Sequence, residues 1–182
     1  MTIQEFIIIY PLASNRSEVD EQIKHLPKPT FLCGKVVPDN LNEISIGEMI
    51  MLQQMISNAP NDYERINGCA LIILHESVPL EYSAEDFFGF GMWVMRELQR
   101  IARLFDSVKN PPTDEERQAG VEQLNFGFFG TLDWYCRRMG ITDHSEAEKV
   151  PWVRVYKCME IDSKTAAYER RLRKIYASKH AK

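Results

Sequence analysis

The chain has few cysteines, and none of them form a close pair. Its 182 residues include four, Cys33, Cys69, Cys136 and Cys158, with no Cys-x-x-Cys spacing among them. Structural zinc sites usually take their ligands in close pairs, so this spacing argues against a bound zinc ion. In a reducing cytosol these residues are expected to act as small apolar side chains of the core.

Long apolar runs are also missing. No stretch approaches the roughly 18 apolar residues that a membrane-spanning helix needs. The run from Phe6 to Tyr10 is too short for a signal peptide, and no positive charge precedes it. We therefore expect no membrane partner, and we expect the protein to stay in the cytosol in which it is made.

The motifs of several enzyme classes are absent. The four histidines do not form the His-Glu-x-x-His pattern of a metalloprotease, and neither Gly-x-Ser-x-Gly nor a phosphate-binding loop occurs. Gly89-Phe90-Gly91 resembles the start of a dinucleotide fingerprint, but it lacks the third glycine and follows a helix-capping signal. We interpret these glycines as room for bulky neighbours, and we predict no catalytic residue, cofactor or metal ion.

An unfamiliar helical active site is the enzymatic alternative. It would require ionisable side chains that converge in a pocket. His75, Glu76 and Asp133 are the first residues to inspect for it.

Charge is distributed unevenly along the chain. The net charge is −4, but residues 169–182 hold six Lys and Arg against Glu169, a charge of +5, so the rest of the chain carries −9. A basic tail of this kind could bind nucleic acid or an acidic partner, as in a regulatory module. It is also typical of a solvated helix end, where cations are favoured.

Capping signals and apolar periodicity predict a mainly α-helical protein. Ser45–Glu48, Ser83–Asp86 and Thr113–Glu116 each open a helix. We expect helices over 46–58, 62–75, 84–108 and 113–139, and a last helix from Pro151. The third has an apolar stripe through Phe87, Val94 and Ile101, and the fourth an apolar face that includes Leu124 and Leu132. These amphipathic helices are predicted to pack into a bundle.

The N-terminal segment has a different character. The β-branched and aromatic residues 3–10 and 31–37 each predict a strand, with a short helix over 17–26 between them. We therefore expect residues 1–40 to form an extended arm or small two-stranded β element, and 41–182 to form the helical domain with its basic C-terminal helix. The arm would lie on a neighbouring molecule or fold back on its own domain.

Glycines alternate with aromatic residues in the run GFFGTLDWY, residues 127–135. Tryptophan and tyrosine are enriched at protein interfaces. We take Trp134, Tyr135, Trp152 and Tyr156 as the candidate partner-binding residues. The alternative is that these aromatic side chains belong to the core, as aromatic stripes at helical spacing usually do.

The run GFFGTLDWYCRRMGITDHSEAEKVPWVRVYKCMEID and the segment from Pro29 to Gln53 resemble small structural or tail-assembly proteins of tailed bacteriophages of gut bacteria. The resemblance implies a non-enzymatic component of a virion, acting in tail or neck assembly. It implies partners among other virion or assembly proteins, or copies of the chain itself as a homo-oligomer. It places the protein in the host cytoplasm during assembly or in the virion.

Overall fold

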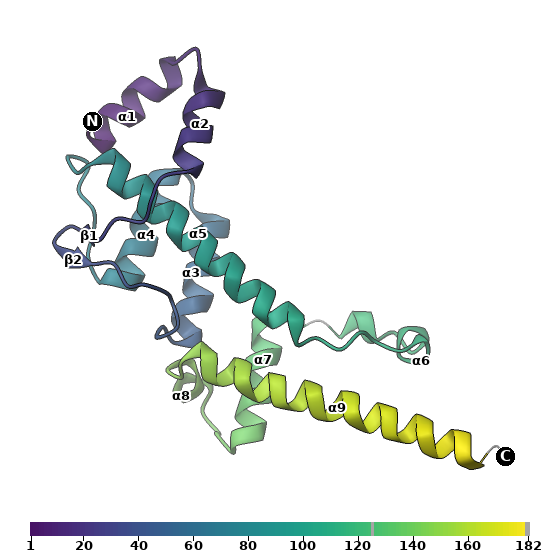
Figure 1. Ribbon diagram of the computed structural model, residues 1–182. Coiled ribbons are helices and arrows are strands. Elements are labelled where there is room, and N and C mark those ends of the chain that lie inside the picture. The colour runs from purple at the N-terminus through teal and green to yellow at the C-terminus, as the bar shows by residue number, and fades with distance from the viewer. Residues whose placement is uncertain (125, 181–182) are drawn as a thin grey trace. The chain divides into compact units, whose positions relative to one another are not determined.

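A computed structural model describes residues 1–124 and 126–180 of the chain (Figure 1), and its described part is mainly α-helical. The small two-stranded sheet pairs β1 (Phe31–Leu32) with β2 (Lys35–Val36) in antiparallel register. These elements confirm the predicted fold class. Two 3₁₀ turns, η1 (Tyr10–Leu12) and η2 (Val121–Gln123), accompany the α-helices α1 (Ile3–Ile9), α2 (Arg16–Lys24), α3 (Ile46–Asn58), α4 (Asp62–Leu74), α5 (Ala84–Ser107), α6 (Asp114–Gln118), α7 (Gly127–Met139), α8 (His144–Glu148) and α9 (Trp152–His180).

The chain forms two compact units. Unit 1 holds residues 1–44 and 48–100, and unit 2 holds residues 45–47 and 101–182. Among the helices of the described residues, none is long and apolar enough to cross a membrane. The division into residues 1–40 and 41–182 stays a prediction.

The core of unit 1 forms where α3, α4 and α5 approach closely. A Cβ added to Gly68 of α4 would lie 2.5 Å from the Met55 sulfur of α3. A Cβ on Gly91 of α5 would lie 2.7 Å from the Ile66 side chain of α4. Because glycine has no side chain, the helices pack closely at these two positions. This confirms the interpretation of Gly91 as a close-packing glycine.

The N-terminal residues run along α5 in the same unit. The Ile3 backbone N–H donates to the Tyr82 carbonyl at 2.9 Å, just before α5 begins. Further along, the Arg96 guanidinium donates to the Leu26 carbonyl at 2.8 Å, and the Leu41 N–H donates to the Glu97 carboxylate at 2.9 Å. This segment therefore folds back on its own unit.

The predicted strand over residues 3–10 is wrong, because this segment forms α1. The Thr2 hydroxyl accepts from the Glu5 N–H at 3.1 Å, and the Glu5 carboxylate accepts from the Thr2 N–H at 2.8 Å. This reciprocal capping box satisfies backbone donors that a strand would have to pair elsewhere. It outweighs the β propensity of the isoleucines that follow.

The second predicted strand, residues 31–37, is split into a tight hairpin. Leu32 pairs with Lys35, and the two residues between them, Cys33 and Gly34, have positive φ values of 49° and 76°. Positive φ at both central positions is the pattern of a type I′ turn, whose twist matches a two-stranded hairpin. The sequence signal was obscure because Cys-Gly replaces the usual Asn-Gly.

Unit 2 is tied together by backbone bonds and side-chain contacts with α9. The Ile46 N–H donates to the Val150 carbonyl at 2.8 Å, just before α9 begins. Phe105, near the end of α5, packs on the Trp152 ring with centroids 5.9 Å apart. Trp152 is 1% exposed, so it lies at the centre of this packing.

The single helix predicted over residues 113–139 is also wrong. The capping box of Thr113 and Glu116 is present, but α6 ends at Gln118. Gly120 then adopts φ 81°, a left-handed conformation that stops a right-handed helix. Of the predicted apolar face, Leu132 is buried in α7 whereas Leu124 is 65% exposed.

The cap of α4 offers a modest test of this local analysis. The Asn61 side-chain oxygen accepts from the Glu64 N–H at 2.8 Å. We expect Asn61→Ala to lower the free energy of unfolding by about 1 kcal/mol, because one helix donor loses its partner. Urea unfolding followed by circular dichroism measures this change, and Asn61→Asp, which retains the acceptor, should restore stability to within about 0.5 kcal/mol of the original chain.

Candidate functional site

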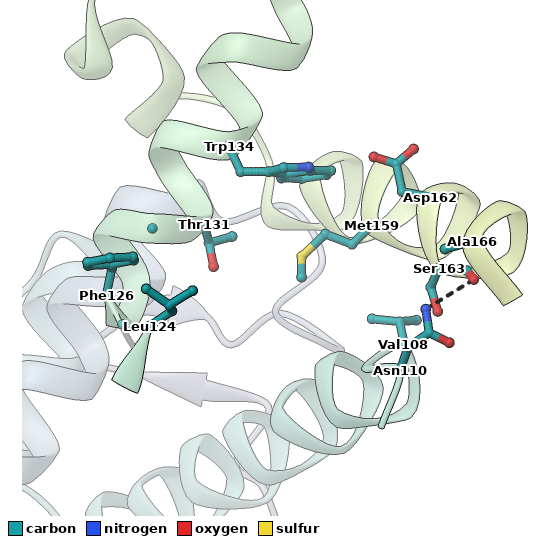
Figure 2. A pocket seen from close by; sticks show the side chains of 12 residues that line it. Val108, Asn110, Leu124, Phe126, Thr131, Trp134, Met159, Asp162, Ser163 and Ala166 are labelled. Carbon is teal, nitrogen blue, oxygen red and sulfur yellow. Dashed lines mark hydrogen bonds between the residues drawn. The ribbon is translucent and has the colours of Figure 1, made fainter. Parts of the chain in front are cut away.

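An open groove in unit 2 is the candidate functional site (Figure 2), with a volume of about 510 Å³. One wall comes from the start of α7 and the residues before it, and another from the middle of α9. The residues just after α5 supply the third. The lining residues are Val108, Asn110, Leu124, Phe126, Gly127, Gly130, Thr131, Trp134, Met159, Asp162, Ser163 and Ala166.

The walls are held by contacts between the elements. The Asn110 amide donates to the Ser163 carbonyl of α9 at 3.2 Å. Arg138 of α7 forms an ion pair with Asp162 of α9, and its guanidinium lies 5.8 Å from the centre of the Trp134 ring. These contacts fix Trp134 between α7 and α9, as Figure 2 shows.

Two exposed apolar side chains lie at the groove. Leu124 is 65% exposed and Phe126 is 67% exposed, and both line the groove. Phe129, in the first turn of α7, is 64% exposed and stacks on the His144 ring with centroids 5.2 Å apart, outside the groove lining. An apolar surface of this kind is typical of an interaction site.

The groove lining offers little for acid–base or nucleophilic chemistry. Asp162 is the ionisable side chain among the lining residues, and Arg138 already neutralises it. In the described part of the chain, no group of three or more His, Cys, Asp or Glu is placed to hold a metal ion. The apolar walls suit the side chains of another polypeptide.

The predicted partner-binding residues fall into two pairs. Trp134 and Tyr135 are 6.4 Å apart between ring centroids on α7, and Trp152 and Tyr156 are 6.3 Å apart on α9. Tyr135 and Trp152 are each 1% exposed and act as core residues in this chain. Trp134 and Tyr156 are half-buried, and Trp134 alone of the four lines the groove.

The residues considered for an enzymatic site belong to different units. His75 ends α4 in a left-handed conformation with φ 56°, followed by Glu76, and both belong to unit 1. Asp133 belongs to unit 2, where its carboxylate lies 2.6 Å from Arg137 and 3.7 Å from the His144 ring nitrogen. Asp133 therefore has partners that account for its position on α7.

Two of the four cysteines are core residues, as predicted. Burial raises the pKa of the Cys69 thiol to about 12, and burial together with the nearby Asp133 and Asp143 raises that of Cys136. A thiol with a raised pKa is a weak nucleophile at neutral pH. Cys33 and Cys158 are half-buried.

The sequence patterns do not reveal the rim of the groove. They predict Leu124 on the apolar face of one long helix and give no role to Phe126. The available signal was the pair Gly120 and Gly127, which follow α6 and begin α7 and adopt φ 81° and 54°. Leu124 and Phe126 lie between these glycines in sequence and line the groove.

Comparison of the chain with protein-family models, with curated proteins and with solved structures gives no match in any of the three.

Proposed function

We propose that the chain is a non-enzymatic assembly component of a bacteriophage particle, acting in tail or neck assembly by binding another virion protein. The observation that carries the binding role is the groove at Trp134 with its exposed apolar residues Leu124 and Phe126. The resemblance of residues 127–162 to tail-assembly proteins supplies the biological setting. The proposal needs no reaction, because binding alone positions a partner.

The proposed occupant of the groove is an amphipathic helix of another virion protein. Binding of this kind places large apolar side chains of the helix in a groove, at intervals of one helical turn. The Asn110 and Thr131 side chains could orient the helix at the groove wall. Half-buried Trp134 would then be the anchor, because tryptophan side chains at the centre of an interface often dominate the binding energy.

The nucleic-acid alternative receives less support from the basic end of α9. Arg170 lies 3.3 Å from the Glu116 carboxylate and donates to the Pro111 carbonyl at 3.1 Å. Arg173 lies 3.3 Å from Glu169 on its own helix. These cations already have partners within unit 2, and Lys182 lies outside the described residues.

Genetic complementation tests the proposed function. We expect deletion of the coding sequence from the phage that carries it to yield incomplete particles, which electron microscopy of lysates would count. The original chain should restore complete particles, and Trp134→Ala should restore at least tenfold fewer, because a central aromatic anchor contributes about 2 kcal/mol or more.

The matched control is Met51→Ala, which removes an exposed apolar side chain, 50% exposed, from unit 1. It should complement as well as the original chain. Particles of normal number and form after the deletion would overturn the proposed function.

A further inference from the structure

Helix α9 has two faces with different surroundings. One face packs within unit 2 through Trp152, Met159 and Ser163, and Arg170 further along forms an ion pair with Glu116. Figure 1 shows α9 as one unbroken helix. Residues at heptad spacing on the opposite side therefore form a continuous second face.

This second face carries a heptad-spaced row, which we call the α9 seam. Its spacings of four and three residues are those of a coiled-coil interface. Ile161 is 55% exposed, Tyr168 is 56% exposed and Ile175 is 51% exposed, so its apolar side chains are largely uncovered. The seam consists of Ile161, Thr165, Tyr168, Leu172, Ile175 and Lys179.

Charged residues flank the seam with opposite signs. On one flank Lys157, Lys164 and Arg171 recur every seven residues. On the other flank Asp162 and Glu169 recur at the same interval. In a coiled coil, residues at these flanking positions form the ion pairs between helices that set partner and orientation.

We propose that the α9 seam binds the seam of a second copy of this chain, with the two helices parallel. In parallel register each basic flank residue faces the residue five positions later on the other helix. Lys164 would pair with Glu169 of the second copy, whereas Lys157 would face Asp162, which Arg138 already neutralises, and Arg171 would face Tyr176. An antiparallel pair would instead bring each flank against its own kind, so the charge pattern selects the parallel arrangement.

Existing ion pairs on α9 do not oppose this association. Lys157 and Lys164 each lie 2.8 Å from Glu160, and Glu169 lies 3.3 Å from Arg173. Pairs between exposed residues of one helix contribute little to stability. They exchange at little cost for pairs between helices that also cover the seam.

The seam contains polar residues as well as apolar ones. Thr165 and Lys179 occupy core positions on either side of Tyr168, Leu172 and Ile175. Polar residues at such positions reduce the stability of a coiled coil. The association is therefore concentration-dependent rather than permanent, which suits an assembly step.

The inference deepens the proposed function by naming a second partner of the same chain, and it is tested separately from the groove. Sedimentation velocity of the full chain over a range of concentrations should show a defined oligomer that dissociates on dilution. Lys164→Glu makes the flanks of identical copies repel, and Glu169→Lys does the same with opposite sign. Each should raise the dissociation constant at least tenfold.

The double variant Lys164→Glu/Glu169→Lys is the decisive control. It restores opposite charges across a parallel pair, and it should recover the association of the original chain. Circular dichroism of all three variants establishes that α9 remains helical. A monomer at every concentration, an oligomer indifferent to both single substitutions, or a double variant that fails to recover would overturn the proposal.

The test of the α9 seam and the test of the groove can fail independently of each other. A monomeric chain that still supports particle assembly through Trp134 would remove the seam interaction and leave the proposed function standing. If the chain forms the oligomer but its phage assembles normally after the coding sequence is deleted, the seam interaction stands and the proposed function fails.

Discussion

Replacing Trp152 by alanine is expected to lower the free energy of unfolding by about 3–5 kcal/mol, because it removes the largest fully buried side chain of the chain. The Trp152 ring packs against Phe105 at 5.9 Å and Tyr156 at 6.3 Å between centroids. Both contacts would face a cavity that α9, anchored by the Ile46–Val150 backbone bond, would fill only in part. The melting temperature should fall by roughly 6–20 °C, measured by circular dichroism.

This experiment also separates two interpretations of the same aromatic residue. If Trp152 were a partner-contact residue of the free chain, its removal would weaken binding and leave stability within about 0.5 kcal/mol. Met139→Ala, at a position 43% exposed near the end of α7, is the control that should show so small an effect. A Trp152→Ala chain as stable as the Met139→Ala chain would contradict the assignment of Trp152 to the core.

Gly89→Ala is expected to destabilise the chain by about 2 kcal/mol. Within a helix, alanine normally stabilises by up to about 1 kcal/mol relative to glycine. At Gly89 the added Cβ would lie 2.4 Å from the Pro27 carbonyl oxygen, a backbone atom that cannot rotate away. Moving it would displace the segment that Arg96 holds at Leu26, and overpacking of this kind costs about 1–3 kcal/mol or more.

The comparison is Gly130→Ala in α7. There the nearest atom to an added Cβ is the Phe126 Cβ at 3.0 Å, and Phe126 is 67% exposed. Because a shift of a few tenths of an ångström relieves a contact of this length, the helix propensity of alanine should offset it, leaving stability within about 1 kcal/mol. Urea unfolding measures the stability of both variants. Equal stability of the two would show that the close approach of Gly89 to Pro27 does not constrain the fold.

Local capping chemistry accounts for most of what could be predicted from the sequence. Ser83 opens α5 as its capping signal predicts, and its hydroxyl accepts from the N–H of the third helix residue at 3.3 Å. Helix α4 begins at Asp62 as expected, although its cap, Asn61, was not predicted. The stripe through Phe87, Val94 and Ile101 is buried as its spacing predicts. These features depend on residues close together in the chain, so the sequence records them directly.

The predictions of secondary structure that were wrong concern segments in which one local signal competed with another. The isoleucines of residues 7–9 favour a strand, yet the Thr2–Glu5 capping box makes the segment a helix with those side chains exposed. Apolar periodicity continues across Gly120, yet the backbone there turns left-handed and ends the helix. Periodicity describes which positions are apolar and does not reveal where the chain changes direction.

The candidate site was predicted only in part for the same reason. Trp134 was identified as a contact residue from its type, and the structure places it in a groove. Tyr135, its neighbour, points into the core, because adjacent residues on a helix face directions about 100° apart. The groove itself joins residues from 108 to 166, and no local pattern reveals such a meeting.

The central claim is that the groove at Trp134 binds a helix of another virion protein. Isothermal titration of the full chain with purified tail and neck proteins of the same phage tests it most directly. We expect saturable binding to one of them. Trp134→Ala should raise the dissociation constant about 30-fold, and Met51→Ala should leave it unchanged. Absence of binding to every one of these proteins, or binding that Trp134→Ala leaves unchanged, would contradict it.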